Sequence, residues 1–130
     1  MFALDTNTLV CFFKGAGRVK ELLLATPPAE VAIPSVVLYE LEVGIAQSQQ
    51  PSKRRAQLDG LAALVSILSL DAAAAKQAAE LDSALRRKGT AIGPMDTLIA
   101  GTALAHRATL VTHTLAEFRR VPGLKLVDWY

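Results

Sequence analysis

Short apolar segments alternate along the chain with longer segments of helical character. The apolar segments, bounded by polar residues or proline, predict five strands, at residues 1–4, 31–33, 65–70, 109–112 and 124–129. Between them, a first helix begins at residue 5 or 6, and further helices are expected at residues 18–25, 36–47, 53–63, 72–88 and 94–107, with a single helical turn at 116–119. Short strands that alternate with helices are typical of an α/β sandwich around a mainly parallel five-stranded sheet.

Capping residues mark where several of these helices begin and end. Asp5 and Asp71 each precede a helical segment and are expected to accept backbone hydrogen bonds as N-caps. Ser35 is expected to do the same for the helix that follows it. Gly89 follows the Ala-rich helix and suits the left-handed C′ position. The polar stretch at residues 47–52 is expected to form a loop between two helices.

The helix at residues 94–107 is expected to be buried, although it carries a carboxylate. Pro94 suits the first helical position, where its missing N–H costs nothing. From residue 98 to residue 105 almost every side chain is apolar or small, and a helix that is apolar on all sides normally lies in a core. Asp96 stands in the first turn. Taken alone, it is explained by the helix dipole, which such an acid stabilises by roughly 0.3–1 kcal/mol.

Composition limits the class of protein. With 130 residues, 52% of them apolar, the chain is expected to form a single domain, residues 1–130, with a substantial core. No apolar run reaches the roughly 18 residues of a membrane span. Asp5 falls where the apolar region of a signal peptide would begin, so we expect a cytoplasmic protein with no membrane partner. Cys11 is alone, which excludes a disulfide framework and a cysteine metal site.

The charge of the chain does not by itself indicate a nucleic-acid partner. The formal net charge is only +2. Positive residues gather in three short clusters, and each cluster taken singly is better explained by a solvated helix face or a helix C-terminus: Lys53-Arg54-Arg55, Arg86-Arg87-Lys88 and Arg119-Arg120.

Four acids from distant parts of the chain are expected to meet at one edge of the sheet. Asp5 ends the first strand, Glu40 lies early in the helix after the second, Asp96 begins the helix before the fourth, and Glu117 follows the fourth strand by five residues. In α/β sheets, working sites lie beyond the carboxyl ends of the strands. Clustered carboxylates repel one another unless a cation neutralises them, and oxygen ligands without Cys or His favour Mg²⁺ or Mn²⁺. Such a site suits metal-assisted hydrolysis of phosphodiesters.

Some residues near this set need a choice. Spacing alone does not separate Glu40 from Glu42, but Glu40 is nearer the helix start and therefore nearer the sheet edge, so we prefer it. His106 and His113 are left out of the chemistry, because a single histidine without a placed partner is more often structural.

With these residues assembled, nearly the whole chain resembles the PIN-domain ribonucleases and, among them, the toxin subunit of VapBC toxin–antitoxin pairs. Each matching motif is short, and their order and spacing together carry the resemblance. The motifs are Leu4-Asp5-Thr6-Asn7, Ile33-Pro34-Ser35, Tyr39-Glu40-Leu41 with Gly44, Asp96-Thr97-Leu98-Ile99-Ala100, Thr112 with Glu117-Phe118, Val121-Pro122-Gly123-Leu124 and Asp128-Trp129.

The resemblance implies a three-layer α/β/α fold with a mainly parallel sheet and an acidic pocket that holds one or two Mg²⁺ or Mn²⁺ ions. It implies endonucleolytic cleavage of RNA, with tRNA as the expected substrate, leaving 5′-phosphate and 3′-hydroxyl ends. It also implies a homodimer that is inhibited by a small cognate antitoxin. The basic clusters are then candidates for binding the RNA backbone.

The resemblance also implies roles for individual residues. Asp5 and Asp96 match the principal metal ligands, and Glu40 matches the second acid of the motif, binding metal directly or through water. Polar residues beside the site match Thr6, Asn7 and Thr112. Many relatives carry Asp or Asn two residues after that threonine, where this chain has Thr114. Glu117 or a water would then replace the fourth acid, although Glu117 is explained equally well as an acid at a helix terminus.

Two other functions are compatible with parts of this pattern. A phosphatase-like hydrolase would use Asp5 as a covalent nucleophile, but the related haloacid-dehalogenase signature needs a second Asp where this chain has Asn7. A non-catalytic PIN-like module would keep the acids only to bind a basic peptide. Clustered carboxylates are costly to retain without a cation, which argues against the second alternative.

Overall fold

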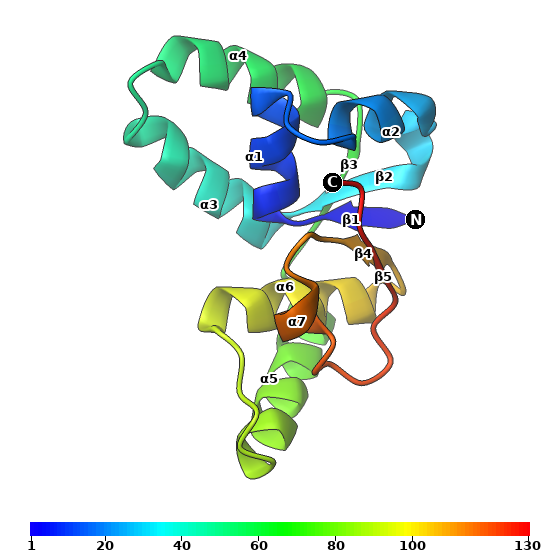
Figure 1. The fold of residues 1–130 in the computed structure, drawn as a ribbon. Coiled ribbons are helices and arrows are strands. Elements are labelled where there is room, and N and C mark those ends of the chain that lie inside the picture. Colours follow the sequence, from blue (N-terminus) through cyan, green and yellow to red (C-terminus); the bar gives the residue numbers. More distant parts are fainter.

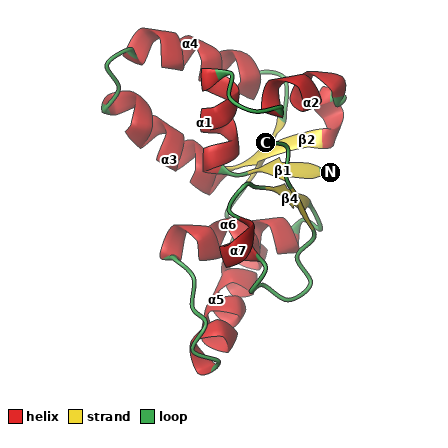
Figure 2. Cartoon of the chain, in the orientation of Figure 1, coloured by secondary structure: helices red, strands yellow, loops and turns green.

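The computed structural model describes all 130 residues, and five short strands with seven α-helices make up its regular structure (Figures 1 and 2). The strands are β1 (Phe2–Leu4), β2 (Val31–Pro34), β3 (Ser66–Leu68), β4 (Thr109–Val111) and β5 (Leu126–Val127). The helices are α1 (Thr6–Lys14), α2 (Val19–Ala25), α3 (Ser35–Ala46), α4 (Pro51–Ala62), α5 (Ala72–Arg87), α6 (Pro94–Ala105) and α7 (Leu115–Phe118). A 3₁₀ turn at Pro28–Glu30 precedes β2.

All neighbouring strands are parallel, and their order is β3-β2-β1-β4-β5. The chain builds outward from β1 to β3 and then returns to the other side of β1 for β4 and β5. The prediction of a mainly parallel five-stranded sheet is confirmed, and the sheet is parallel throughout. The outer strands are shorter than predicted, because β3 and β5 each pair with only one neighbour.

The helices form two layers, one on each face of the sheet. α1, α2, α3 and α4 lie above the sheet in Figure 1, and α5, α6 and α7 lie below it. This is the three-layer α/β/α arrangement that the resemblance implied. The central strands are sealed from both sides: Ala3, Leu4, Ala32, Ile33, Leu110 and Val111 have no exposed surface.

Helix α6 lies in the core, as its sequence predicted. Ile99, Ala100 and Ala103 are buried, and Thr102 satisfies its hydroxyl by donating to the Leu98 carbonyl at 2.8 Å. Gly101 is required by the packing of α6 on α5, because a Cβ atom at this position would lie only 2.6 Å from the Cβ of Ala78. The small residues of α6 therefore let α5 approach closely behind the helix that carries Asp96.

Several predicted helix caps are confirmed. Asp5 and Asp71 each accept a hydrogen bond from the backbone N–H three residues further on. Gly89 has a φ of 69° and follows α5 as the predicted left-handed residue.

Other local predictions were wrong. Ser35 is the first residue of α3 rather than its N-cap, and its hydroxyl oxygen instead accepts the Leu70 N–H at 3.0 Å, which ties α3 to the end of β3. The predicted loop at residues 47–52 is shorter, because α4 begins at Pro51 with a proline in its first turn. None of the helices combines the length and apolar character needed to cross a membrane.

Candidate active site

The chain adds strands on one side of β1 up to β3 and then on its other side from β4, so the strand order reverses at β1. In parallel α/β sheets a crevice is expected at this point, beyond the carboxyl ends of the strands. A cavity of about 180 Å³ lies at this position. It is lined by the four predicted acids and by four other residues: Asp5, Glu40, Asp96, Glu117, Thr6, Asn7, Ile99 and Thr114. The structure thus brings together acids that are up to 112 residues apart in the sequence.

Asp5 is held rigidly at the start of α1. Only 4% of its surface is exposed, and its Oδ1 accepts the Thr8 N–H at 2.8 Å. Thr8 in turn donates its hydroxyl to the Val111 carbonyl at 3.0 Å, and the Asp5 N–H donates to the same carbonyl at 3.2 Å. These bonds join the end of β1 to the end of β4 and fix the Asp5 carboxylate beside the cavity.

The two glutamates of α3 have different environments. Thr6 donates its hydroxyl to Oε1 of Glu40 at 2.7 Å, which joins the first turn of α1 to α3 at the cavity wall. Glu42 lies outside the cavity and accepts two hydrogen bonds from the Arg55 guanidinium, which lower the pKa of Glu42. Glu40 is therefore placed with the other acids, whereas Glu42 belongs to a surface ion pair with α4.

Asp96 and Glu117 form the opposite wall of the cavity. Burial raises the pKa of Asp96 to about 7, together with a hydrogen bond to Glu117 and the negative charges of the neighbouring acids. Glu117 also accepts the Gly93 N–H at 2.9 Å, so α7 is attached to the residue that caps α6. At neutral pH Asp96 therefore retains its proton in part, and no positive side chain lines the cavity to offset its charge.

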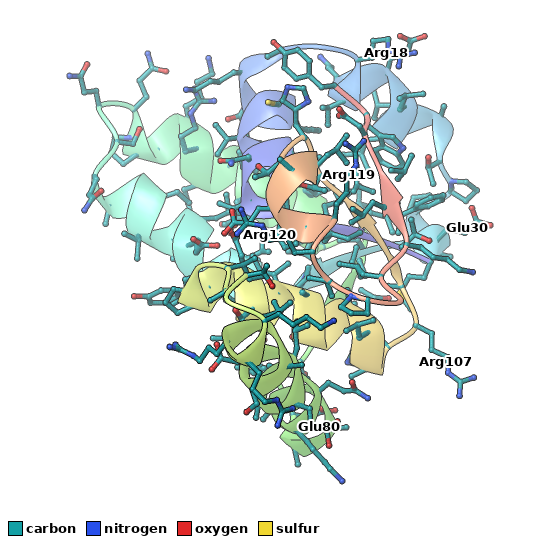
Figure 3. All side chains as sticks on the ribbon, turned by 60° about the horizontal axis from the view of Figure 1, so that its bottom comes forward. Arg18, Glu30, Glu80, Arg107, Arg119 and Arg120 are labelled. Carbon is teal, nitrogen blue, oxygen red and sulfur yellow. The ribbon has the colours of Figure 1, made fainter.

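The segment after β4 supplies the remaining predicted residues. Thr112 is completely buried and does not line the cavity; its Oγ1 accepts the Thr114 N–H at 2.9 Å and so supports the turn that brings Thr114 to the wall. Asn7 lines the cavity and is exposed. Arg120, next to α7 in Figure 3, donates to the Ala91 carbonyl at 3.1 Å. Sequence reasoning did not anticipate that α7 holds the segment before α6 in this way.

The residues of the cavity fit a hard divalent cation by their chemistry. The available donors are carboxylate and hydroxyl oxygens, with no sulfur or imidazole, a set that Mg²⁺ and Mn²⁺ prefer. The structure contains no three His, Cys, Asp or Glu side chains placed so that they could hold one metal ion. Asp96 lies beside Glu117, so a cation bound here would compete with the proton that Asp96 retains.

The two histidines lie outside this cavity. His113 Nδ1 lies 2.8 Å from Oδ2 of Asp128, and its ring stacks on Tyr130 with centroids 4.4 Å apart. His106 ends α6, and its Nε2 is buried without a hydrogen-bond partner. Neither histidine is placed to exchange protons with a group in the cavity.

The sequence of the chain is similar to those of known protein families and individual proteins. The family model described as PIN domain matches residues 2–124. The chain is 34% identical over 128 residues to the tRNA(fMet)-specific endonuclease VapC of Salmonella typhimurium, covering 98% of this chain and 97% of the relative. It is 38% identical over 131 residues to ribonuclease VapC2 of Rickettsia felis, covering 99% and 98% of the two chains.

Solved structures give the same result for the fold. The chain superimposes on DNA-bound VapBC from Salmonella typhimurium with a TM-score of 0.92 and 34% identity, covering 99% of this chain and 98% of that one. VapBC2 from Rickettsia felis, bound to a DNA fragment from the promoter, matches with a TM-score of 0.89 and 34% identity over the same shares. These likenesses span almost the full length of each chain, so the fold is shared throughout.

Proposed function

The chain belongs to the PIN-domain family and is an endoribonuclease toxin of the VapC type, and we propose that the carboxylate cavity is its active site and works with a bound Mg²⁺ or Mn²⁺ ion. The observation that carries the proposal is the convergence of Asp5, Glu40, Asp96 and Glu117 on one cavity without a compensating positive side chain. The raised pKa of Asp96 expresses the cost of that arrangement. A divalent cation would remove this cost, and the cavity supplies the oxygen ligands that it needs.

We propose Asp5 and Asp96 as the principal metal ligands, because they come from opposite walls of the cavity. Glu40 is proposed to bind the ion directly or through a water, with its orientation fixed by the Thr6 hydroxyl. Glu117 is bonded to the Gly93 N–H, so its first role is to hold α6 in place, and it supplies a fourth carboxylate beside Asp96. Thr114 stands where relatives carry an acid or amide, and its hydroxyl can bind a water of the ion.

The chemistry divides between the ion and the protein. When bound, a divalent cation offsets charge that develops on the phosphate and acidifies the attacking water. Asp5 is immobilised by its N-cap bond and its burial, so its carboxylate needs no reorganisation during the reaction. With an ion bound, Asp96 would give up its proton and hold the ion as a carboxylate. Asn7 is exposed on the same wall and is placed to contact the substrate.

We further propose tRNA as the substrate and a VapB-type antitoxin as the partner. The support for tRNA is the name of the Salmonella relative, a tRNA(fMet)-specific endonuclease with 34% identity to this chain. The support for the antitoxin is that the similar solved structures are VapBC complexes. A basic residue of the antitoxin would complement the uncompensated acids of the cavity and block it.

We also propose a homodimer. Its support is an apolar face formed by α3, the segment after β3 and the start of α6, where large apolar side chains are exposed: Tyr39 (59%), Leu70 (38%) and Met95 (36%). Apolar patches of this kind often mark protein interfaces. Light scattering on the purified chain would report a mass of two copies, and a monomer at all concentrations would contradict the proposal.

A cleavage assay tests the function. The purified chain, freed from any antitoxin, is incubated with total tRNA with and without Mg²⁺ or Mn²⁺, beside Asp96→Asn. We expect discrete fragments with 5′-phosphate ends only from the wild type with metal. Cleavage that persists in the chelated sample or in Asp96→Asn would contradict the site. Binding to a basic antitoxin without any metal-dependent cleavage would indicate a docking module instead.

A further inference from the structure

A second, larger cavity of about 280 Å³ adjoins the carboxylate cavity and shares Thr6 and Glu40 with it. It lies between α1 and α3, which both lead away from the sheet toward α4 (Figure 1). Four of its ten lining residues are apolar, and they come from two helices: Val10 and Phe13 of α1, and Leu41 and Ile45 of α3. Thr6 and Glu40, which are hydrogen-bonded to each other at 2.7 Å, line both cavities, so the two cavities are adjacent.

Positive charge lies along this second cavity, in contrast to the first. Lys14 and Arg54 are among its lining residues. Lys14 lies eight residues beyond Thr6 on α1, which places it about 12 Å further along the helix. Arg54 is oriented by bonds from its Nη1 to the Phe13 carbonyl at 3.0 Å and to Gln57 at 2.8 Å, which leave its other N–H groups free. Lys14 and Arg54 therefore offer positive charge to phosphate groups at the end of the cavity away from Glu40.

Gly44 indicates that the second cavity is kept open. It lies inside α3, where glycine costs roughly 0.5–1 kcal/mol relative to alanine. Neither packing nor backbone conformation requires it, because a Cβ atom there would have no neighbour within 4 Å and its φ is not positive. Because Gly44 lines the cavity, any larger side chain would project toward the space that a ligand would fill.

We propose that this cavity binds a nucleobase of the RNA next to the cleaved phosphodiester, with the following phosphates held by Lys14 and Arg54. Apolar walls with an aromatic side chain are how proteins commonly hold unstacked RNA bases, and cations on the same groove bind the backbone. The proposal rests on the proposed function, since it places the scissile phosphate in the carboxylate cavity. It makes the α1–α3 groove the part of the enzyme that selects nucleotides beside the cut.

The test fills the cavity without removing any contact of the fold. Gly44→Leu is compared with Gly60→Leu, since Gly60 is likewise an exposed helical glycine with open space around it but lies outside this cavity. Both substitutions improve helix propensity, so both variants are expected to fold. The substrate is an RNA stem-loop that contains a cleavage site mapped with the wild type, and kcat and KM are measured separately with Mn²⁺.

We expect Gly44→Leu to raise KM at least tenfold with kcat within threefold of the wild type, and Gly60→Leu to change neither. Replacing each base beside the cut by an abasic nucleotide should raise the wild-type KM at one position and leave the KM of Gly44→Leu unchanged there. Lys14→Gln should reduce the slope of log KM against log salt concentration by about one, because one phosphate contact is lost. Equal KM values for the two glycine variants would overturn the nucleobase proposal and leave the proposed function standing. The groove would then serve another ligand, such as the antitoxin. Absence of metal-dependent cleavage by the wild type would overturn the proposed function as well.

Discussion

Asp5 and Asp96 both stand at the start of a helix that faces the cavity, but their surroundings differ. Asp5 caps α1, is nearly inaccessible to solvent and has a backbone N–H partner at 2.8 Å. Asp96 lies in the first turn of α6, where burial, followed by a hydrogen bond to another acid, Glu117, raises its pKa to about 7. The carboxylate of Asp5 therefore has its partner within the protein, whereas Asp96 lies beside a second acid with no positive side chain lining the cavity. The difference indicates that Asp5 stabilises the fold in addition to lining the cavity.

The largest effect is expected for neutral replacements at the two walls. Asp96→Asn and Asp5→Asn should each lower cleavage by about 1,000-fold, because each removes a carboxylate from an ion whose contribution is several kcal/mol. Their stabilities should differ: without metal at pH 7.5, Asp96→Asn should be more stable than the wild type, since it removes repulsion, and Asp5→Asn should not. Single-turnover cleavage and urea unfolding check this, and loss of stability in Asp96→Asn would contradict the comparison.

A smaller effect separates the two glutamates of α3. Glu40→Gln should lower cleavage by about 10- to 100-fold, as expected when a group that orients a ligand or its water is removed. Glu42→Gln should stay within twofold of the wild type, because it breaks only an exposed ion pair with Arg55. The two variants have the same chemistry and the same helix, so the ratio of their rates measures position alone. Equal losses would remove the assignment of Glu40.

The raised pKa of Asp96 predicts how stability depends on pH in a chelated sample. The native protein binds the Asp96 proton more tightly than the unfolded chain, whose pKa is 3.8. The resulting stabilisation is complete below pH 4 and is lost as the pH rises through about 7. The free energy of unfolding of the wild type, relative to that of Asp96→Asn, should therefore fall from about pH 4 to about pH 7 and change little at higher pH. A parallel pH dependence of the two proteins would show that Asp96 does not carry this proton.

The smallest expected effect concerns the cap. Asp5→Ala should destabilise the protein by about 1 kcal/mol relative to Asp5→Asn, because asparagine still accepts the Thr8 N–H and alanine does not. Both variants should be inactive to the same degree, so this difference separates the structural role of Asp5 from its chemical role. Urea titrations of the two variants at one pH measure it directly.

Much of this architecture could be predicted from the sequence, because local signals and topology agreed. Asp5 and Asp71 as caps, the buried α6 and the convergence of the acids all followed from strand–helix alternation and the position of each acid after a strand. Glu117 could be placed near the site for the same reason. The central strands could be predicted because short, continuous apolar runs are stable only where both faces of the strand are buried.

The remaining features depend on contacts that are distant in sequence. Ser35 has the composition of an N-cap, but its hydroxyl is used by Leu70, which the tertiary fold brings to it. The bond between Glu117 and Gly93 spans 24 residues and has no local signature. The groove beside the acids was not predicted, because Gly44 lines a cavity only when α1 and α4 pack beside α3. The ends of β3 and β5 also could not be predicted, because each edge strand extends only as far as its single neighbour forms hydrogen bonds with it.

The central claim is that the two walls of the cavity together hold a divalent cation. Calorimetric titration of Mn²⁺ into the metal-free wild type, Asp96→Asn and Glu42→Gln at pH 7.5 tests it most directly, with proton release followed in two buffers. We predict one saturable site in the wild type and in Glu42→Gln, release of part of a proton on binding, and at least tenfold weaker binding by Asp96→Asn. Equal Mn²⁺ affinity in all three proteins would contradict the account.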